Sequence, residues 1–187
     1  MKIAVLGKGN VGSALGEAWR RAGHDVEYGG RENLAQAAAA AEVVVVALPW
    51  PATKSALRSL DLKGKVVIDC TNPMRADLSG LETSDISGAE QVAGWAAGAR
   101  VVKAFNSTGS NNMENPVYAG AKIPMFYCGD DDAAKKTAAQ LVSDVGFTPQ
   151  DAGPLANARL LEAQAMLWVW MAFHGMGREF AFQIVKR

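Results

Sequence analysis

The sequence has few residues of the kinds that crosslink a chain or bind metals. Its 187 residues include only two cysteines, Cys70 and Cys128, and two histidines. The cysteines lie far apart and have no metal-ligand spacing, so we predict no metal site. Cytoplasmic proteins keep their thiols reduced, and isolated cysteines of this kind are typical of them. We therefore interpret both thiols as small buried hydrophobes.

An excess of charge and a long hydrophobic run are also missing. Nineteen basic residues balance nineteen acidic ones, which does not indicate nucleic-acid binding. The longest apolar run, Ala165–Phe173, is well short of the about 20 residues that a membrane span requires. The N-terminal run Ile3–Leu6 is too short for the core of a signal peptide. These features predict a cytoplasmic protein with no membrane or nucleic-acid partner.

The sequence offers no set of residues for acid–base catalysis. His24 follows the first predicted helix and His174 ends the last one, and each is more simply explained as a helix C-terminal residue than as a base. No Ser-His-Asp set is present. We therefore predict no catalytic side chain.

Apolar strands alternate with amphipathic helices along the chain, which predicts βαβ units and a mostly parallel sheet. The predicted strands are Lys2–Leu6, Val26–Tyr28, Val43–Leu48, Lys65–Cys70, Arg100–Phe105, Met125–Cys128 and a shorter Phe147–Asp151. The predicted helices are Asn10–Ala22, Leu34–Ala41, Ala52–Leu60, Ser87–Ala97 after a capping box, Asp130–Val145 capped by Asp130, and Asn157–Phe173. This pattern predicts a doubly wound α/β fold.

A glycine loop, "GKGNVG" at residues 7–12, follows the first predicted strand and opens the first predicted helix. In that position Gly7 permits the tight turn, Gly9 lets the backbone approach a pyrophosphate, and Gly12 lets the helix pack on the strand. The helix N-terminus, at Asn10 and Val11, would offer free N–H groups to the phosphates. The alternative is a glycine-rich turn without a ligand.

The end of the second predicted strand indicates which dinucleotide is bound. A carboxylate about 20 residues past the loop normally holds the adenosine ribose, but here Gly30 and Arg31 occupy that place. Gly30 leaves room, and the Arg31 guanidinium can bind a 2′-phosphate, so the pair favours NADP over NAD. The alternative is that Arg31 is a solvated loop residue, and pairing with Glu32 would weaken its role. Glu27 lies too early in the strand to face the ribose.

Over essentially its whole length the chain resembles the NADPH-dependent oxidoreductases of the coenzyme F-420 (deazaflavin) family. That family is similar to the cytosolic domain of the six-transmembrane epithelial metalloreductases. The motifs that carry the resemblance are "GKGNVG", "GGRE", "ALPWPA", "VVIDCTNP", "VVKAFNSTG", "MFYCGDD", "DAGPLANARLLE" and "GMGREFAF". The family implies a Rossmann domain, here residues 1–152, with a helical C-terminal extension, residues 153–187, and usually a dimer. Many members also have a longer glycine loop, a serine before the arginine and a second basic residue where Asn33 and Leu34 stand here.

The resemblance also implies further cofactor-binding residues, which follow the third, fourth and fifth predicted strands. They are Leu48, Pro49 and Trp50 beside the dinucleotide, and Thr71, Asn72, Pro73, Ala104, Phe105 and Asn106 near the nicotinamide. Independently, the carboxyl ends of parallel strands meet at one crevice. Asn72 and Asn106 could bind a carboxamide or a flat heterocycle there, or could be turn residues that bind the backbone. Lys103, within a strand, forms a salt bridge or stabilises an anionic reduced ring.

The absence of acid–base residues favours hydride transfer between two flat rings, which requires only that the rings be stacked at short distance. The leading hypothesis is hydride transfer between NADPH and a small-molecule redox partner, coenzyme F-420 or a flavin. The alternatives are metal reduction through a bound flavin, and a non-enzymatic NADP-binding sensor.

The last predicted helix is nearly apolar on all sides from Ala165 to Phe173. Such a helix is buried on every side, and in a short chain a partner subunit would supply part of the cover. We therefore predict a homodimer with Trp168 or Trp170 in the contact and Gly177–Phe180 nearby. The alternative is a helix buried within its own monomer.

Overall fold

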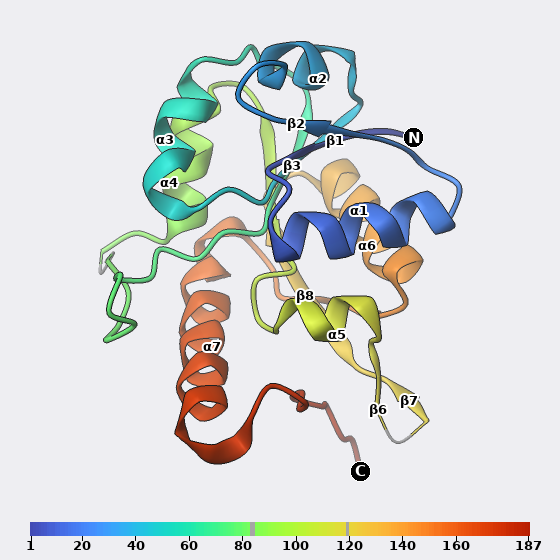
Figure 1. Cartoon of the computed structure of the whole chain (residues 1–187), viewed down its shortest axis with the longest axis vertical. Coiled ribbons are helices and arrows are strands. Elements are labelled where there is room, and N and C mark those ends of the chain that lie inside the picture. The colour runs from blue at the N-terminus through green and yellow to red at the C-terminus, as the bar shows by residue number, and fades with distance from the viewer. Residues whose placement is uncertain (83–84, 119) are drawn as a thin grey trace.

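The computed structural model describes residues 1–82, 85–118 and 120–187, which fold around one seven-stranded sheet (Figure 1). The strand order is β2-β1-β3-β4-β5-β8-β9. The strands are β1 (Lys2–Leu6), β2 (Asp25–Gly29), β3 (Val43–Val46), β4 (Val66–Asp69), β5 (Arg100–Ala104), β8 (Pro124–Gly129) and β9 (Thr148–Asp151). All neighbours pair in parallel except β8, which is antiparallel to β5. The predicted mostly parallel, Rossmann-like sheet is confirmed.

Helices cover both faces of the sheet. One core contains residues of α1 (Asn10–Arg21) and α6 (Asp132–Val145), and the short α5 (Ser110–Glu114) packs beside α1. The other core contains residues of α2 (Leu34–Ala40), α3 (Trp50–Arg58), α4 (Gly88–Trp95) and α7 (Ala158–Met171). Alternate residues of β1 enter the two cores, Ile3 and Val5 in the first, Ala4 and Leu6 in the second. This is why the strand is apolar on both faces.

The chain reverses its winding beside β1, and this reversal locates the functional crevice. The strand β2 pairs with one edge of β1 in the register Val5↔Tyr28, and β3 pairs with the other edge in the register Val5↔Val45. The connections from β1 and β3 therefore leave in opposite directions. In open α/β sheets, ligands bind outside the carboxyl ends of the strands at such a switch point.

Local capping signals explain where α4 and α6 begin. The predicted capping box at α4 is present, with the Ser87 hydroxyl accepting from Glu90 N at 3.1 Å and the Glu90 carboxylate accepting from Ser87 N at 2.7 Å. The cap of α6 is a correction. Asp131 rather than Asp130 accepts from the backbone of α6, and Asp130 instead accepts from Leu155 N at 2.8 Å. Asp130 thus ties the end of β8 to the C-terminal segment.

Two small features were not predicted: α5 and the hairpin of β6 (Val117–Tyr118) with β7 (Ala121–Lys122). The α5 sequence, "SNNME", has two asparagines and little helix propensity of its own. Distant contacts stabilise it, because Asn112 Nδ2 donates to Phe180 O of the C-terminal tail at 2.8 Å. The helix α3 also begins at Trp50, two residues earlier than predicted, since Pro51 is accepted in the first turn.

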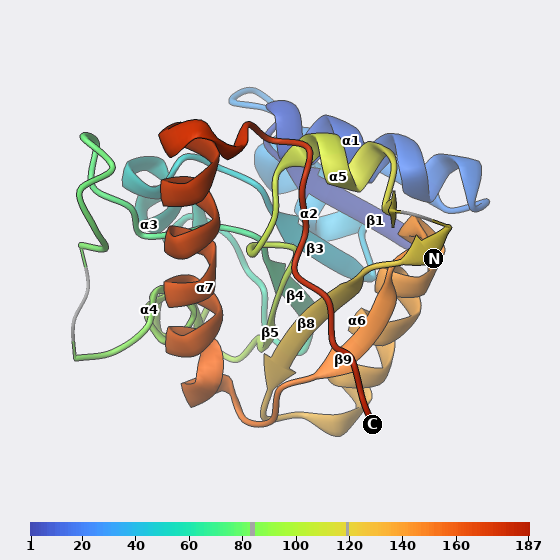
Figure 2. The same ribbon diagram turned by 90° about the horizontal axis from the view of Figure 1, so that it is seen from below.

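The C-terminal segment contains a short 3-10 turn (Leu155–Asn157), α7 and a final π-type turn (Ala172–Met176), followed by a tail that crosses β8 (Figure 2). The alternative that α7 is fully buried within its own monomer is wrong, because part of its apolar surface is exposed in the single chain. Trp168 is buried, stacked on Phe180 at 5.2 Å, but Trp170 is 54% exposed. No helix in the described part of the chain combines the length and apolar character needed to cross a lipid bilayer.

The close contact between Gly7 and Gly12 gives a test of the loop's packing. A Cβ added at Gly12 would lie 2.2 Å from Gly7 O, a backbone atom, whereas one added at Gly9 would meet nothing within 4 Å. We expect Gly12→Ala to lower the free energy of unfolding by about 1–3 kcal/mol, as overpacking does. The control Gly9→Ala should change it by less than about 0.5 kcal/mol. Urea denaturation measures both, and equal stabilities would contradict the packing role.

Candidate functional site

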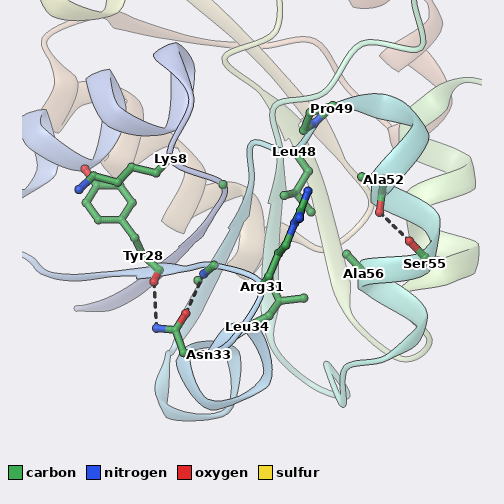
Figure 3. Close-up of a pocket in the computed structure, with 13 residues that line it drawn as sticks. Lys8, Tyr28, Arg31, Asn33, Leu34, Leu48, Pro49, Ala52, Ser55 and Ala56 are labelled. Atoms are coloured by element: carbon green, nitrogen blue, oxygen red, sulfur yellow. Dashed lines mark hydrogen bonds between the residues drawn. The ribbon is translucent and has the colours of Figure 1, made fainter.

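A cavity of about 700 Å³ lies at the switch point, between the glycine loop, the end of β2 and the start of α3 (Figure 3). Its lining residues are Gly7, Lys8, Tyr28, Gly29, Gly30, Arg31, Asn33, Leu34, Leu48, Pro49, Ala52, Ser55 and Ala56. Five of the predicted site residues are among them: Gly7, Gly30, Arg31, Leu48 and Pro49. The structure therefore brings the glycine loop, the arginine and the turn after β3 together around one space.

The glycine loop has the geometry that the sequence predicts. Gly7 has a φ of 101°, and a Cβ there would lie 2.5 Å from Ala47 O, so only glycine fits. Gly9 is the N-cap residue of α1, and no side chain among the described residues forms a capping hydrogen bond at this end of the helix. The first N–H groups of α1, at Asn10 and Val11, are thus available to an anion at the mouth of the cavity. The side chain of Val11 itself packs on the core.

The turn after β2 is shaped by Asn33. Gly30 N donates to Asn33 Oδ1 at 2.7 Å, and Asn33 Nδ2 donates to Tyr28 O at 3.1 Å. These bonds fix the backbone on both sides of Gly30 and direct Arg31 to the cavity. Asn33 was not predicted as a site residue, although an asparagine that closes a tight turn is a recognised signal.

Arg31 is exposed, and its side chain extends toward Leu48 and Pro49 (Figure 3). No salt bridge within the described residues involves it, so Glu32 does not pair with Arg31. Glu27 lies within β2 and accepts from Asn33 Nδ2 at 3.4 Å. The guanidinium therefore faces the cavity with its charge unpaired by the fold.

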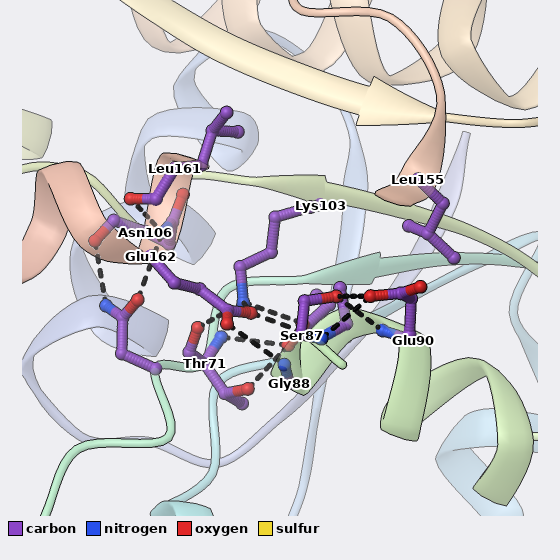
Figure 4. Close-up of polar contacts among 12 residues, drawn as sticks. Thr71, Ser87, Gly88, Glu90, Lys103, Asn106, Leu155, Leu161 and Glu162 are labelled. Atoms are coloured by element: carbon purple, nitrogen blue, oxygen red, sulfur yellow. Dashed lines mark hydrogen bonds and ion pairs between the residues drawn. The ribbon is translucent and has the colours of Figure 1, made fainter. Parts of the chain in front are cut away.

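Asn72 and Asn106 form a second polar group, outside the cavity lining. Asn72 Nδ2 donates to Asn106 O at 2.8 Å, and Asn106 Nδ2 donates to Asn72 Oδ1 at 3.0 Å and to Leu161 O at 3.0 Å (Figure 4). Both side chains thus serve the fold, as the turn interpretation predicts. Yet Asn106 Oδ1 is buried with no hydrogen-bond partner among the described residues, and a buried acceptor of this kind needs one.

Among the other residues predicted near the nicotinamide, Ala104 and Phe105 have buried side chains, so they could contact a ligand mainly through their backbone. Ala104 and Phe105 are buried, and the Phe105 ring packs 5.6 Å from Trp19 and 6.4 Å from Phe147 in the core. Phe105 has a φ of 60°, which is unusual for a bulky residue and turns the chain sharply after β5. The Phe105 ring therefore belongs to the core, and only the backbone of Phe105 could border the crevice.

The remaining predicted residues of the site also contact the fold. Trp50 packs against Trp95 with ring centres 5.1 Å apart. The hydroxyl of Thr71 donates to Asp69 Oδ1 at 2.7 Å, and Pro73 lies against Gly88 at the start of α4. None of these three lines the 700 Å³ cavity.

A buried ionic cluster lies beneath these turns (Figure 4). Lys103 Nζ is 2.9 Å from Asp69 Oδ2 and 3.0 Å from Glu162 Oε1, and all three side chains are buried. Lys103 also donates to Thr71 O at 2.5 Å. Burial opposes the charge of Lys103, but the carboxylates of Asp69 and Glu162 outweigh it and raise its pKa. Lys103 therefore forms the salt bridge that was one of its two predicted roles.

The cluster also reaches the helix α4. Glu162 accepts from Gly88 N at 3.0 Å and from Ala89 N at 3.1 Å, so its negative charge is placed at the N-terminus of α4. One lysine faces two carboxylates, and the helix N-terminus compensates the second. The cluster thereby fixes β4, β5, α4 and α7 relative to one another.

The cysteines and histidines lie outside the cavity lining. Cys70 and Cys128 are free and buried, and burial raises the pKa of Cys128 to about 12, so neither is a reactive thiolate. His24 is 2.8 Å from Asp144, and His174 Nδ1 is 2.7 Å from Trp170 O at the end of α7. Both histidines thus contact the ends of helices, as predicted.

Several cavity residues were missed from the sequence. In the sequence, Asn33 and Leu34 stand out only as departures from the family pattern. Lys8 lies within the glycine loop, and its positive charge was the feature that could have marked it as a site residue. The others are Tyr28, Gly29, Ala52, Ser55 and Ala56. These residues belong to no recognisable motif. Small residues on a helix and an aromatic residue in a strand are as typical of a hydrophobic core as of a binding site.

Comparison with known proteins identifies relatives of this chain. A family model described as NADP oxidoreductase, coenzyme F420-dependent, matches residues 27–73. The metalloreductase STEAP3 of Rattus norvegicus is 31% identical over 179 residues, which are 87% of this chain. The chain spans 36% of the length of that relative.

Solved structures agree with these sequence relatives. A protein designated an F420-dependent NADP reductase from Arthrobacter sp. FB24 superposes with a TM-score of 0.90 at 29% identity, covering 100% of both chains. A reductive aminase from Aspergillus terreus, in complex with NADPH and ethyl levulinate, has a TM-score of 0.69 at 17% identity, over 93% of this chain and 62% of that one. The second match shows a shared fold. The resemblance seen in the sequence is confirmed, and the family and relatives indicate an NADP-dependent oxidoreductase.

The ionic cluster gives a test of its contribution to stability. Lys103→Met leaves Asp69 and Glu162 as buried carboxylates without their cation, so we expect the free energy of unfolding to fall by about 3–5 kcal/mol. Lys135→Met is the matched control, because Lys135 lies at the same 2.9 Å from Asp151 but that pair is partly exposed. Its loss should be about 0–1 kcal/mol. Urea unfolding measures both, and similar losses would refute the role of burial.

Proposed function

Since the family and relatives indicate an NADP-dependent oxidoreductase, we propose that this chain transfers hydride between NADPH and a deazaflavin or flavin. The observation that carries the proposal is the unpaired Arg31 in a cavity beside the glycine loop. No carboxylate is among the described residues that line this cavity. An arginine in place of the ribose-binding acid can bind the 2′-phosphate of NADPH, which a carboxylate there would repel.

The residues present fit a dinucleotide along the switch point. The space in front of Gly9 is open, since an added Cβ would meet nothing within 4 Å, and a pyrophosphate could therefore approach the backbone there. The N–H groups of Asn10 and Val11 would bind its oxygens. Leu48 and Pro49 would form the apolar wall opposite Arg31.

The nicotinamide end would lie by the turns after β4 and β5. There the unpartnered Asn106 Oδ1 would accept a hydrogen bond from a carboxamide N–H group, which would satisfy this buried acceptor. The backbone of Thr71, Asn72 and Pro73 on one side, and of Ala104 and Phe105 on the other, would then border the ring. Bound NADPH supplies the hydride itself.

The role left to this chain is binding and orientation. None of the described residues that line the cavity is a histidine. Lys103 and its two carboxylates are paired with one another in the core. An alcohol or hydroxy-acid substrate would require a positioned proton donor. A flat redox ring requires only that it be held against the nicotinamide at short distance.

A second candidate is reduction of ferric or cupric ions through a flavin. The 31% identity with a metalloreductase favours it. Both candidates share the NADPH site and differ in the final acceptor.

One assay separates these candidates. NADPH oxidation by the protein would be followed against the deazaflavin, FMN, FAD, and a ferric chelate with and without flavin. Turnover with the deazaflavin or a flavin alone supports the leading proposal. Turnover that requires the ferric chelate supports the second. NADPH binding without turnover on any acceptor would contradict both and indicate a sensor.

We also propose that residues 1–152 form the dinucleotide-binding part and residues 153–187 the dimerisation part, in a cytoplasmic homodimer. Two free, buried thiols suit a reducing compartment. Leu167, Trp170 and Phe173 of the C-terminal segment are 50%, 54% and 69% exposed. They adjoin a groove of about 660 Å³ between α7 and residues 77–81. A second copy related by a two-fold axis would cover this surface.

The prediction that Trp168 or Trp170 lies in the dimer contact is narrowed by the structure. Trp168 is 5% exposed, and its Nε1 donates to Phe180 O at 3.1 Å within the same chain. Phe180 covers Trp168 by stacking on it, while Arg178 and Glu179 accept hydrogen bonds from Asn111 of α5. Trp170 is the tryptophan that remains available to a partner.

Arg31→Ala tests the choice of nucleotide. A charge-assisted contact with the 2′-phosphate has no counterpart in NADH, and such contacts contribute about 1.5–3 kcal/mol. We therefore expect the NADPH dissociation constant to rise about tenfold or more, with little change for NADH. Titration calorimetry measures both constants. An equal loss for the two nucleotides would remove this role of Arg31.

Trp170→Glu tests the dimer. A carboxylate in the middle of an apolar contact costs several kcal/mol when it is left unpaired, so the variant should sediment as a monomer at micromolar concentration while the unaltered protein sediments as a dimer. The control is Val185→Glu, which adds the same charge at an 85% exposed position in the tail. A dimer that survives Trp170→Glu would discard this surface, and a monomeric unaltered protein would discard the dimer.

A further inference from the structure

The charge of Lys8, the second residue of the glycine loop, is not paired by the fold. It is exposed and lines the same cavity as Arg31. Its ammonium makes no salt bridge or hydrogen bond with any described residue, and its one recorded interaction is with an aromatic ring. The sequence thus places a second cation at the cavity that the packing of the chain does not require.

Tyr28 determines where this cation lies. The Lys8 ammonium is 5.2 Å from the centre of the Tyr28 ring (Figure 3), close enough for a cation–π interaction. The ring is fixed in turn, because Arg20 lies 4.8 Å from it and Gly16 leaves room for the Tyr28 hydroxyl, 2.3 Å from where a Cβ would be. Tyr28 belongs to β2, directly before Gly29 and Gly30. The ammonium is therefore held over the end of β2.

The position over β2 distinguishes the two phosphate groups of a dinucleotide. A pyrophosphate, common to NAD and NADP, lies at the N-terminus of α1, near the N–H groups of Asn10 and Val11. The end of β2 instead faces the adenosine ribose. Lys8 lines the cavity together with Gly30 and Arg31 at the end of β2, where only NADP carries a phosphate.

Charge matching calls for a second cation there. A phosphate monoester carries about −1.5 to −2 charges near pH 7. Arg31 supplies one positive charge and the described lining of the cavity contains no acidic residue. The two positions after Glu32, Asn33 and Leu34, are uncharged, so no cation follows Arg31 in that turn. One arginine alone would leave part of the phosphate charge uncompensated.

We propose that Lys8, positioned by Tyr28, is the second cation that recognises the 2′-phosphate of NADP and that it sets the preference over NAD together with Arg31. The proposal rests on the proposed function, since it requires that the cavity hold the adenosine end of a dinucleotide.

The test measures the dissociation constants of two pairs of ligands by titration calorimetry. The first pair is NADP⁺ and NAD⁺. The second pair is 2′,5′-ADP and 5′-AMP, which both lack the nicotinamide and differ only in the 2′-phosphate. Lys8→Gln keeps most of the side chain's length and removes its charge. We expect NADP⁺ and 2′,5′-ADP to bind about five- to tenfold more weakly, as the loss of an exposed charged contact would give, and NAD⁺ and 5′-AMP to change less than about twofold.

Two further variants separate a direct contact from a general loss of positive charge. Lys54→Gln removes a charge from an exposed residue of α3 that does not line the cavity, so it should leave both pairs of constants within about twofold. Lys8→Arg restores a cation at the same position and should recover most of the preference for NADP⁺. Both outcomes support a contact made by Lys8 itself.

Three results would overturn the inference. An equal loss for NADP⁺ and NAD⁺ in Lys8→Gln would assign Lys8 to the pyrophosphate. Unchanged dissociation constants for both nucleotides would show that Lys8 contacts neither phosphate group. A loss of NADP⁺ affinity in Lys54→Gln as large as that in Lys8→Gln would attribute the effect to the overall positive charge near the site and not to a contact by Lys8. If the unaltered protein binds neither nucleotide, the proposed function fails first, and the inference fails with it.

Discussion

The buried contact of Lys103 with Asp69 and Glu162 is the constraint on which the arrangement of the crevice depends. It joins two central strands to the first turn of α4 and to α7, segments far apart in the sequence. Buried charges are costly unless each one is paired, so this cluster permits only one relative position of these elements. The turn after β4 inherits that position, because Asp69 and Lys103 also bind Thr71 directly. The hydrogen bonds between Asn72 and Asn106 join it to the turn after β5.

The cavity at the switch point depends on the backbone of the glycine loop. Gly7 and Gly12 bring the first strand and helix so close that no side chain fits between them, and Gly9 leaves open space in front. The charges of Arg31 and Lys8 come from the two loops that border this cavity. A rigid base with cations at the edge of the cavity suits the proposed function, in which bound cofactors would carry the chemistry.

Local patterns in the sequence predicted the seven strands of the main sheet, the longer helices and the glycine loop, because each depends on neighbours within a few residues. The capping box at Ser87 is an example. The exposure of Trp170 and burial of Trp168 could not be predicted, since the tail that covers Trp168 is folded back by Asn111 and Asn112 of α5. The place of Phe105 in the core likewise depends on an unusual backbone angle. Lys8 carried a visible charge, but only the Tyr28 ring showed where it points.

The C-terminal tail is held largely through its main chain. Asn111 Nδ2 donates to Arg178 O, and both Asn112 Nδ2 and Trp168 Nε1 donate to Phe180 O. Carbonyl groups are the same in every residue, so these bonds specify a path, while Glu179 and Phe180 are also held through their side chains. Beyond them, the exposed residues 183–187 could vary widely and alter the surface of the tail without disturbing how the segment is anchored.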